Sequence, residues 1–293
     1  MQIVTLLAHP DRADLTAAVA DPIRARWGGG DLRWLDEGLA AEFGVETVPG
    51  DFWRVWQALQ TQGFDIAVQP EEGRRKRVLL ADMDSTMIGQ ECIDELAAEA
   101  GAGEFVASIT ARAMNGELDF EAALRERVAL LKGLPAEAIA KVLAERITFA
   151  SGGRKLVGTM KANGGYAVLV SGGFTAFTEA VAAYLGFDED HANTLQVEGG
   201  RLAGTVAEPI LGREAKVARL SEVCDRLGIP EDAVIAVGDG ANDLAMLHRA
   251  GTGVALHAKP SVAAQCDIRV NHGDLTALLY LQGYAGEEFI AAP

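Results

Sequence analysis

Residues 78–86, Val78-Leu79-Leu80-Ala81-Asp82-Met83-Asp84-Ser85-Thr86, decide the fold. Four small or apolar residues lead into two carboxylates at i and i+2 and then into two hydroxyl side chains. A short apolar run is typical of a buried strand in a parallel sheet covered on both faces, and ligands bind beyond the carboxyl ends of such strands. Carboxylates this close repel unless a cation, a proton or a hydrogen bond compensates them. The stretch therefore predicts a metal-dependent catalytic site.

The same pattern recurs twice, at 166–170 and at 234–238. The first run leads into Ser171-Gly172-Gly173-Phe174 and the second into Gly238-Asp239-Gly240-Ala241-Asn242-Asp243. Helical patterns separate the runs, and this alternation is typical of parallel strands joined by crossovers. We therefore predict an α/β fold with a Rossmann-like parallel core sheet. Its helices are expected at 151–163, 174–185, 213–227 and 244–250, and its final strands at 253–256 and 268–270.

Two other parts of the chain flank this core. Residues 91–149 are helical in pattern almost throughout, and we interpret them as a helical cap inserted between core segments 74–90 and 150–293. A β-hairpin is expected at 195–206 around a Gly-Gly turn. Residues 1–73 predict a small N-terminal α+β domain without a catalytic constellation. Its strands are expected at 2–8 and 31–35 and its helices at 14–27 and 52–62.

Charge and cysteine content limit the classes of function. With 26 basic and 42 acidic residues the net charge is −16, which argues against binding to nucleic acid or to an anionic membrane. The basic run 74–77 precedes a buried strand, so we interpret it as a solvated linker. The three cysteines lack CxxC spacing, and neither a secretory signal nor a bilayer-spanning run is visible. These features predict a cytoplasmic protein; a homodimer stays open.

The polar strand ends together suit phosphoryl transfer. Several carboxylates with a lysine, Lys216 at a helix start, form an oxygen-rich site typical of Mg²⁺, whereas zinc is disfavoured because no Cys/His set is present. Lys216, the Ser171 hydroxyl and backbone N–H groups of the following glycines suit a phosphoryl group. Asp82 is then placed to attack phosphorus, and Asp84 to transfer the proton of the leaving oxygen.

These four segments, in this order, resemble the motifs of the haloacid dehalogenase (HAD) superfamily. The Ser-Thr pair after Asp84 and the helical insertion are similar to the phosphoserine phosphatase branch, and the resemblance covers about residues 75–285. It implies Mg²⁺-dependent hydrolysis of O-phospho-L-serine to L-serine and phosphate through an aspartyl phosphate, the last step of serine biosynthesis. The implied partner is thus the small molecule O-phosphoserine.

The resemblance also implies a role for each motif residue. Asp82 is the nucleophile and a metal ligand, and Asp84 is the acid/base and binds the metal through its backbone carbonyl. Asp239 is the third metal ligand, and Asp243 supports the ligands. The phosphate is implied to be held by four residues: Ser171, Gly172, Lys216 and Asn242.

The cap residues predict which substrate is chosen. Phosphoserine carries a carboxylate and an ammonium besides its phosphate, so Arg127 is expected to bind the carboxylate through paired hydrogen bonds and Glu91 the ammonium. Phe120 and Met87 are expected to form an apolar lid over the serine moiety. Asp94 and Glu95 are expected on the helix surface.

Two alternatives stay open at this point. A related HAD phosphatase or phosphotransferase for another small phosphate ester would not need both Glu91 and Arg127. An amino-acid-binding regulatory protein with a spent hydrolase core would suit residues 1–73, whose size and β–α pattern resemble an ACT-type domain. A spent core need not keep the complete set of motif residues, and this favours an enzyme.

Overall fold

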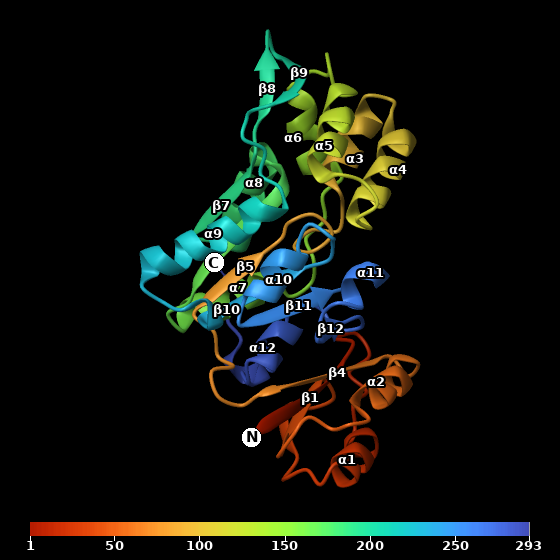
Figure 1. Ribbon diagram of the computed structural model, residues 1–293, viewed down its shortest axis with the longest axis vertical. Helices are drawn as coiled ribbons and strands as arrows, with labels where there is room; N and C mark the ends of the chain where they lie inside the picture. Colours follow the sequence, from red (N-terminus) through yellow and green to blue (C-terminus); the bar gives the residue numbers. More distant parts are fainter. Residues whose placement is uncertain (293) are drawn as a thin grey trace.

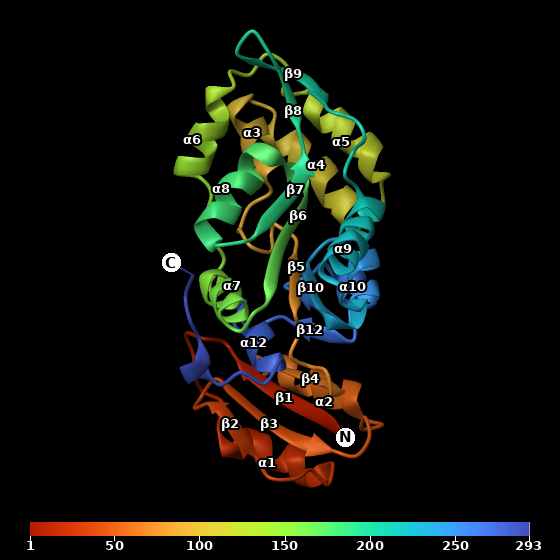
Figure 2. The ribbon, with the colours of Figure 1, turned by 90° about the vertical axis from the view of Figure 1, so that its left-hand side faces the viewer.

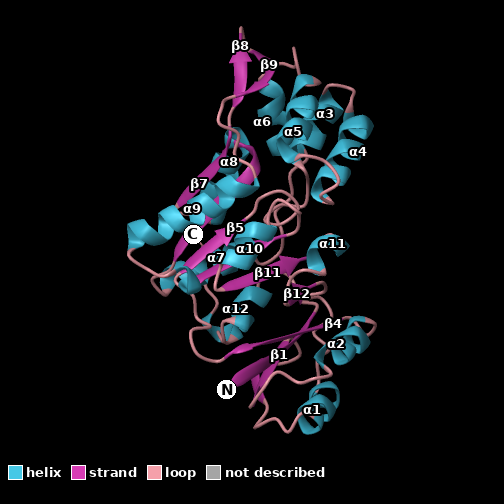
Figure 3. Ribbon diagram, viewed as in Figure 1, coloured by secondary structure: helices cyan, strands magenta, loops and turns pink. Residues whose placement is uncertain are grey.

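The computed structural model describes residues 1–292 and has three parts along its long axis (Figure 1). A four-stranded sheet with two helices lies at one end, a six-stranded sheet lies in the middle, and helices with a two-stranded hairpin lie at the other end (Figure 3). Within residues 1–292 no helix is long and apolar enough to cross a membrane.

The central sheet has the strand order β12-β11-β10-β5-β6-β7, and all its neighbouring strands are parallel. This confirms the predicted Rossmann-like core. The strands are β5 (Val78–Ala81), β6 (Tyr166–Phe174), β7 (Glu189–Asn193), β10 (Val234–Gly238), β11 (Thr252–Leu256) and β12 (Ile268–Val270). Sequence reasoning missed β7, because its residues Glu-Asp-His-Ala-Asn lie at the edge of the sheet and lack an apolar run.

Successive side chains of β5 enter two different apolar clusters, one on each face of the sheet. Leu79 and Ala81 belong to one cluster, and Val78 and Leu80 to the other. This follows from the two-residue period of a strand, and it explains why the run carries no polar position. Helices cover both faces: α7 (Gly153–Ala162), α8 (Thr175–Leu185) and α12 (Ala277–Leu281) contribute to the first cluster, and α9 (Arg213–Leu227), α10 (Leu244–Arg249) and α11 (Pro260–Ala263) to the second.

The helical insertion contains four helices, and the predicted hairpin packs against it. The helices are α3 (Cys92–Glu99), α4 (Gly103–Met114), α5 (Phe120–Ala129) and α6 (Glu137–Glu145), and the hairpin strands are β8 (Leu195–Glu198) and β9 (Arg201–Val206). Leu202 of β9 exchanges backbone hydrogen bonds of 2.8 Å with Gly133 and Leu134. We call these helices and the hairpin the cap. The predicted domain boundaries stay a prediction.

The N-terminal unit has the order β–α–β–β–α–β of ferredoxin-like folds, with antiparallel strands in the order β2-β3-β1-β4. Its elements are β1 (Gln2–Ala8), α1 (Ala17–Arg26), β2 (Arg33–Asp36), β3 (Ala40–Val45), α2 (Phe52–Gln60) and β4 (Phe64–Pro70). Sequence reasoning missed β3 and β4. The resemblance to an ACT-type domain stays a prediction.

Polar contacts attach this unit to the core beside β12 and α12 (Figure 2). The buried Asp65 carboxylate accepts three backbone N–H groups, from Asn271 (3.0 Å), His272 (2.8 Å) and Gly273 (2.8 Å). The predicted solvated linker at 74–77 is wrong in one respect. The Arg74 side chain is 12% exposed and binds Glu42 at 2.6 Å, because its fixed planar donors match a carboxylate.

Candidate active site

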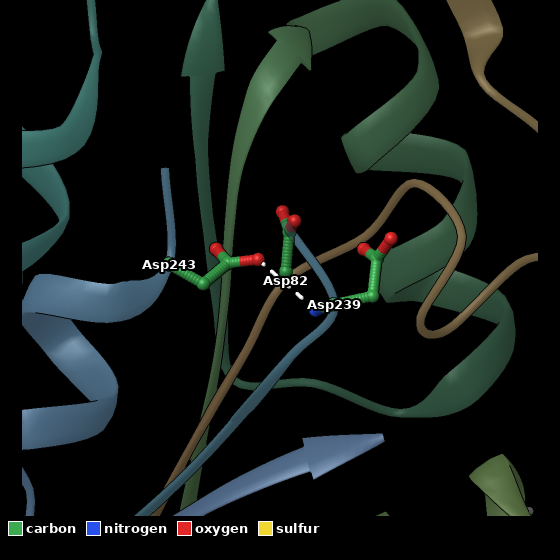
Figure 4. Close-up of side chains that lie close together, drawn as sticks. All are labelled: Asp82, Asp239 and Asp243. Atoms are coloured by element: carbon green, nitrogen blue, oxygen red, sulfur yellow. Dashed lines mark hydrogen bonds between the residues drawn. The ribbon is translucent and has the colours of Figure 1, made fainter. Parts of the chain in front are cut away.

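Three neighbouring strands bring the predicted site residues to one edge of the sheet. Asp82 follows β5, Ser171 lies on β6, and Asp239 follows β10; β5 pairs with both of the others. Figure 4 shows the carboxylates of Asp82, Asp239 and Asp243 close together. One oxygen of each lies within 4.8 Å of the others, and all three residues are buried.

Asp243 shapes the loop after β10 and holds Lys216. Its Oδ2 accepts the N–H groups of Asp239 (3.1 Å) and Gly240 (3.0 Å), and its Oδ1 accepts a hydrogen bond from Lys216 Nζ at 2.7 Å. The loop needs glycine at 238, because a β carbon there would lie 2.4 Å from Asp243 Cγ. Both Asp243 oxygens are therefore engaged within the protein, which suits the supporting role expected for this residue.

Lys216 is fully buried and lies between two carboxylates. Its Nζ is 2.7 Å from Asp82 Oδ1 and 2.7 Å from Asp243 Oδ1. Burial alone would lower the pKa of Lys216, but Asp243 and Asp82 outweigh that effect and raise the pKa, so the ammonium stays charged. Burial and the charge of Asp243 raise the pKa of Asp82 well above its usual range, although Lys216 opposes the shift.

The positive charge near Asp84 and Asp239 is also too small to compensate two buried carboxylates. Burial, with the nearby charge of Glu91, raises the pKa of Asp84 to about 8. Burial, with the charges of Asp243 and Glu91, raises the pKa of Asp239 to about 7. Among residues 1–292, Asp84 Oδ1 is buried without a hydrogen-bond partner. An oxygen-rich, undercompensated cluster of this kind fits a hard divalent cation such as Mg²⁺.

Lys259 is a further site residue that sequence reasoning missed. Its Nζ donates to Asp239 Oδ2 at 3.0 Å, and its backbone N–H donates to the carbonyl oxygen of Asp239 at 3.0 Å. Lys259 follows β11, the neighbour of β10. The parallel arrangement was therefore the signal that could have found it, because the carboxyl end of β11 lies at the same edge of the sheet.

A narrow cavity with a free volume of about 20 Å³ lies between cap and core. It is lined by predicted residues and by apolar cap residues: Asp82, Asp84, Glu91, Ile93, Met114, Phe120, Leu124, Arg127, Ser171, Gly172, Gly173, Asp239 and Asn242. Lys216 and Asp243 lie behind this wall, in contact with each other. Met87 does not reach the cavity, since it is buried in the main apolar cluster. Met114 supplies the apolar side chain expected from Met87.

Arg127 is a buried cation at the cavity wall without a carboxylate partner. It is 2% exposed, and it donates from Nε to the Ala123 carbonyl (3.1 Å) and from Nη1 to the Thr110 hydroxyl (2.9 Å). Within residues 1–292, no carboxylate oxygen lies within 4.0 Å of its guanidinium nitrogens. Burial lowers the pKa of Arg127, although the Glu91 charge opposes this. A buried, unpaired guanidinium favours binding of an anion.

Glu91 lines the same cavity, and Asp94, which is not among the lining residues, is connected to Arg127 through the Thr110 hydroxyl. Glu91 Oε1 accepts a hydrogen bond from the Ser85 hydroxyl at 2.8 Å. The Thr110 hydroxyl, which accepts from Arg127, donates to Asp94 Oδ1 at 2.5 Å. The prediction that Asp94 is a surface residue is therefore wrong, because α4 packs against α3 at that position. Glu95 is 28% exposed and pairs with Arg146 at 3.2 Å.

The parallel sheet and the carboxylate cluster at its edge are typical of one class of hydrolase, and comparison with known proteins gives the same class. Residues 79–248 match the model of the haloacid dehalogenase-like hydrolase family. The chain belongs to this family, which confirms the resemblance drawn from the four motifs.

Individual relatives narrow the class. A phosphoserine phosphatase of Streptomyces coelicolor is 43% identical over 302 residues, covering 99% of this chain and 72% of the relative. Among solved structures, a HAD family hydrolase of Salmonella enterica serovar Typhi has a TM-score of 0.83 and 30% identity and covers 96% of this chain and 97% of its own. A phospho-aspartyl intermediate analogue of phosphoserine phosphatase has a TM-score of 0.67 and 40% identity, covering 70% and 98%. This chain is thus similar to phosphoserine phosphatases.

Proposed function

We propose that this enzyme hydrolyses O-phospho-L-serine to L-serine and phosphate in the cavity between cap and core. One observation carries the choice of substrate. Arg127 is buried without a carboxylate partner, and it shares one cavity with Asp82 and with Glu91. A substrate with a phosphate, a carboxylate and an ammonium has one group for each of these residues. The names of the relatives support the same substrate.

Asp82, Asp239 and the backbone carbonyl of Asp84 would hold Mg²⁺, which when bound supplies positive charge against the phosphoryl oxygens. The Asp82 carboxylate attacks phosphorus, and the bond from phosphorus to the serine oxygen breaks. Asp84 gives its proton to that oxygen, so L-serine leaves and an aspartyl phosphate remains. Asp84 then takes a proton from a water molecule, which attacks phosphorus and frees phosphate and Asp82.

The raised pKa of Asp84, about 8, suits this exchange of a proton. Lys216 touches Asp82 and stays charged, so it is suited to offset negative charge during transfer. Ser171, Gly172 and Asn242 line the cavity and are proposed to contact the phosphate. The amide of Asn242 would reach the phosphate through its Nδ2–H donors, because its Oδ1 can only accept a hydrogen bond.

The cap is proposed to choose the substrate and to exclude water. Arg127 binds the carboxylate, Glu91 binds the ammonium, and Phe120 and Met114 cover the serine carbons. A backbone hydrogen bond of 3.0 Å from Ala241 N–H to the Met114 carbonyl joins cap to core. Exchange of substrate and product requires this contact to open.

We place the reaction in serine biosynthesis, because L-serine is its product. We also place it in a reducing compartment, the cytoplasm, which the buried, unpaired state of Cys92, Cys224 and Cys266 supports. The homodimer stays a prediction.

Phosphate release from a panel of esters tests the proposal. The panel contains O-phospho-L-serine, O-phospho-D-serine, O-phospho-L-threonine and two sugar phosphates, each with Mg²⁺ and with chelator. We expect a preference for O-phospho-L-serine that chelator abolishes and that Asp82→Asn removes. Asp225→Asn, on the exposed side of α9, is the control and should keep full activity.

The panel also tests the alternatives. Equal turnover of sugar phosphates would keep Asp82 as nucleophile and overturn the roles of Glu91 and Arg127. Absence of turnover with every ester would favour the regulatory protein with a spent core.

A further inference from the structure

The contact between Lys259 and Asp239 joins a buried anion to a cation that reaches solvent. Asp239 is 2% exposed, whereas the Lys259 side chain is 34% exposed. The Asp239 carboxylate receives Lys259 Nζ on Oδ2 at 3.0 Å and the Thr86 hydroxyl on Oδ1 at 3.3 Å. Among residues 1–292, Lys259 is the cation within 4.0 Å of this carboxylate. It therefore supplies the counter-charge that a buried carboxylate needs.

The backbone around Lys259 is held on both sides. Its N–H donates to the Asp239 carbonyl, and its own carbonyl accepts the N–H groups of Val262 and Ala263, each at 2.9 Å, at the start of α11. Two residues earlier, His257 has a φ of 46°, its N–H donates to the Val270 carbonyl at 2.8 Å, and its Nε2 lies 2.8 Å from the Gly273 carbonyl. The loop after β11 thus keeps Lys259 beside Asp239.

Under the proposed function, Asp239 also binds a divalent cation. Two positive groups then share one carboxylate and repel each other, whereas in the metal-free protein the ammonium is its one contacting cation among residues 1–292. Removing the ammonium therefore has opposite effects on the two states. It leaves a buried carboxylate uncompensated in the metal-free state, and it removes a repulsion in the metal-bound state.

We propose that Lys259 is a positioning residue that holds the Asp239 carboxylate in the metal-free protein and competes with the bound cation for it. The site thus stays assembled between one cation and the next, and its cation affinity is lower than the carboxylates alone would give. This inference rests on the proposed function, because it takes Asp239 as a metal ligand. A role limited to structural support would instead lower stability with and without the cation.

Two measurements on Lys259→Met test this proposal without substrate. Titration calorimetry with MgCl₂ measures cation affinity, and thermal unfolding in chelator measures the stability of the metal-free protein. We expect Mg²⁺ to bind about tenfold more tightly than to the unchanged protein, since a nearby positive charge is lost. We expect the unfolding temperature to fall in chelator and the fall to shrink at saturating Mg²⁺.

Two further variants make the result specific. Lys259→Arg keeps the charge and should bind Mg²⁺ as the unchanged protein does, so it also serves if the Met variant folds poorly. Lys161→Met is the matched control, because Lys161 is 37% exposed and pairs with Asp188 at 2.8 Å outside the cavity lining. It should leave Mg²⁺ affinity unchanged.

The outcomes separate this inference from the proposed function. Unchanged or weaker Mg²⁺ binding by Lys259→Met, with normal binding by the unchanged protein, would overturn the competition by Lys259 alone. Failure of the unchanged protein to bind Mg²⁺ would overturn the proposed metal site and the inference with it.

Discussion

The ring of Phe120, at the start of cap helix α5, lies directly over the backbone of Gly172 in the core. A β carbon at Gly172 would come within 2.5 Å of Phe120 Cζ, a distance that real β carbons essentially never show. Both residues line the cavity, so this contact closes one side of the proposed site. Position 172 therefore requires glycine because the Phe120 ring fills the space of a β carbon. The backbone conformation is not the reason, since the φ of Gly172 is not in the left-handed region.

Gly172→Ala should accordingly disturb cap closure more than the fold. We expect kcat/KM for O-phospho-L-serine to fall about 100-fold, because a displacement of about 1 Å near the reacting groups has effects of this size. The unfolding temperature should change little, since the cap can move away from the methyl group. Steady-state kinetics and thermal unfolding measure the two effects. Gly50→Ala is the control, because a β carbon there meets open space. Full activity of Gly172→Ala would contradict the closed cap as the catalytic state.

Arg127→Met should remove the preference for a substrate carboxylate. O-phosphoethanolamine lacks this carboxylate but keeps the phosphate and the ammonium. We expect the unchanged enzyme to prefer O-phospho-L-serine by about 10- to 100-fold in kcat/KM, as a charge-assisted hydrogen bond contributes about 1.5–3 kcal/mol. The variant should turn over both esters at similar, low efficiency.

Kinetics with both esters on both proteins check this prediction, and Glu91→Gln provides the comparison. Glu91→Gln should slow both esters alike, because each carries an ammonium. A preference for O-phospho-L-serine that survives in Arg127→Met would contradict the assigned role.

The metal-free protein should lose stability as the pH rises. Burial raises the pKa of Asp84 to about 8 and of Asp239 to about 7 in the folded state. A carboxyl group with a raised pKa binds its proton more tightly when folded, so stability falls between the unfolded pKa of about 4 and these folded values. Thermal unfolding in chelator from pH 5 to pH 9 should show this decline, and Mg²⁺ should raise the unfolding temperature more at pH 8 than at pH 6. A stabilisation by Mg²⁺ that does not grow with pH would count against the undercompensated cluster.

Asp65→Asn should weaken the attachment of the N-terminal unit to the core. Asp65 is 1% exposed and accepts three backbone N–H groups of the segment 271–273. An amide keeps one acceptor oxygen and turns N–H donors toward the others, so we expect a loss of about 1–3 kcal/mol in the free energy of unfolding. Urea denaturation measures it, with the exposed Asp225→Asn as control. Equal stability of the two variants would show that the contact contributes nothing.

Local patterns in the chain predicted the core sheet and most of the site. The apolar runs of β5, β6 and β10 each end in polar residues, and both features are visible within about ten residues of sequence. Parallel strands place their carboxyl ends at one edge, so the sequence alone predicts that Asp82, Ser171 and Asp239 lie close together there. The roles of Glu91 and Arg127 could be predicted only from the resemblance to a family, because a single charged residue on a helix forms no recognisable pattern.

For the other residues, burial and partners depend on contacts between segments that lie far apart in the sequence. The exchange of Met87 for Met114 depends on how the cap sits on the core. Asp94 is half-buried and accepts a hydrogen bond from Thr110 because α4 packs on α3. The burial of Arg74 depends on Glu42, which lies 32 residues away in sequence. Lys259 meets Asp239 across two adjacent strands.

The sequence by itself thus determined which runs of the chain are buried strands. It also determined where each run ends in side chains that can bind or react. The tertiary structure alone decided which charges meet, which are left without a partner, and which apolar side chains face the cavity. The physical reason is range. Strand and helix patterns arise from neighbouring residues, whereas burial and ion pairing depend on packing between elements far apart in the chain.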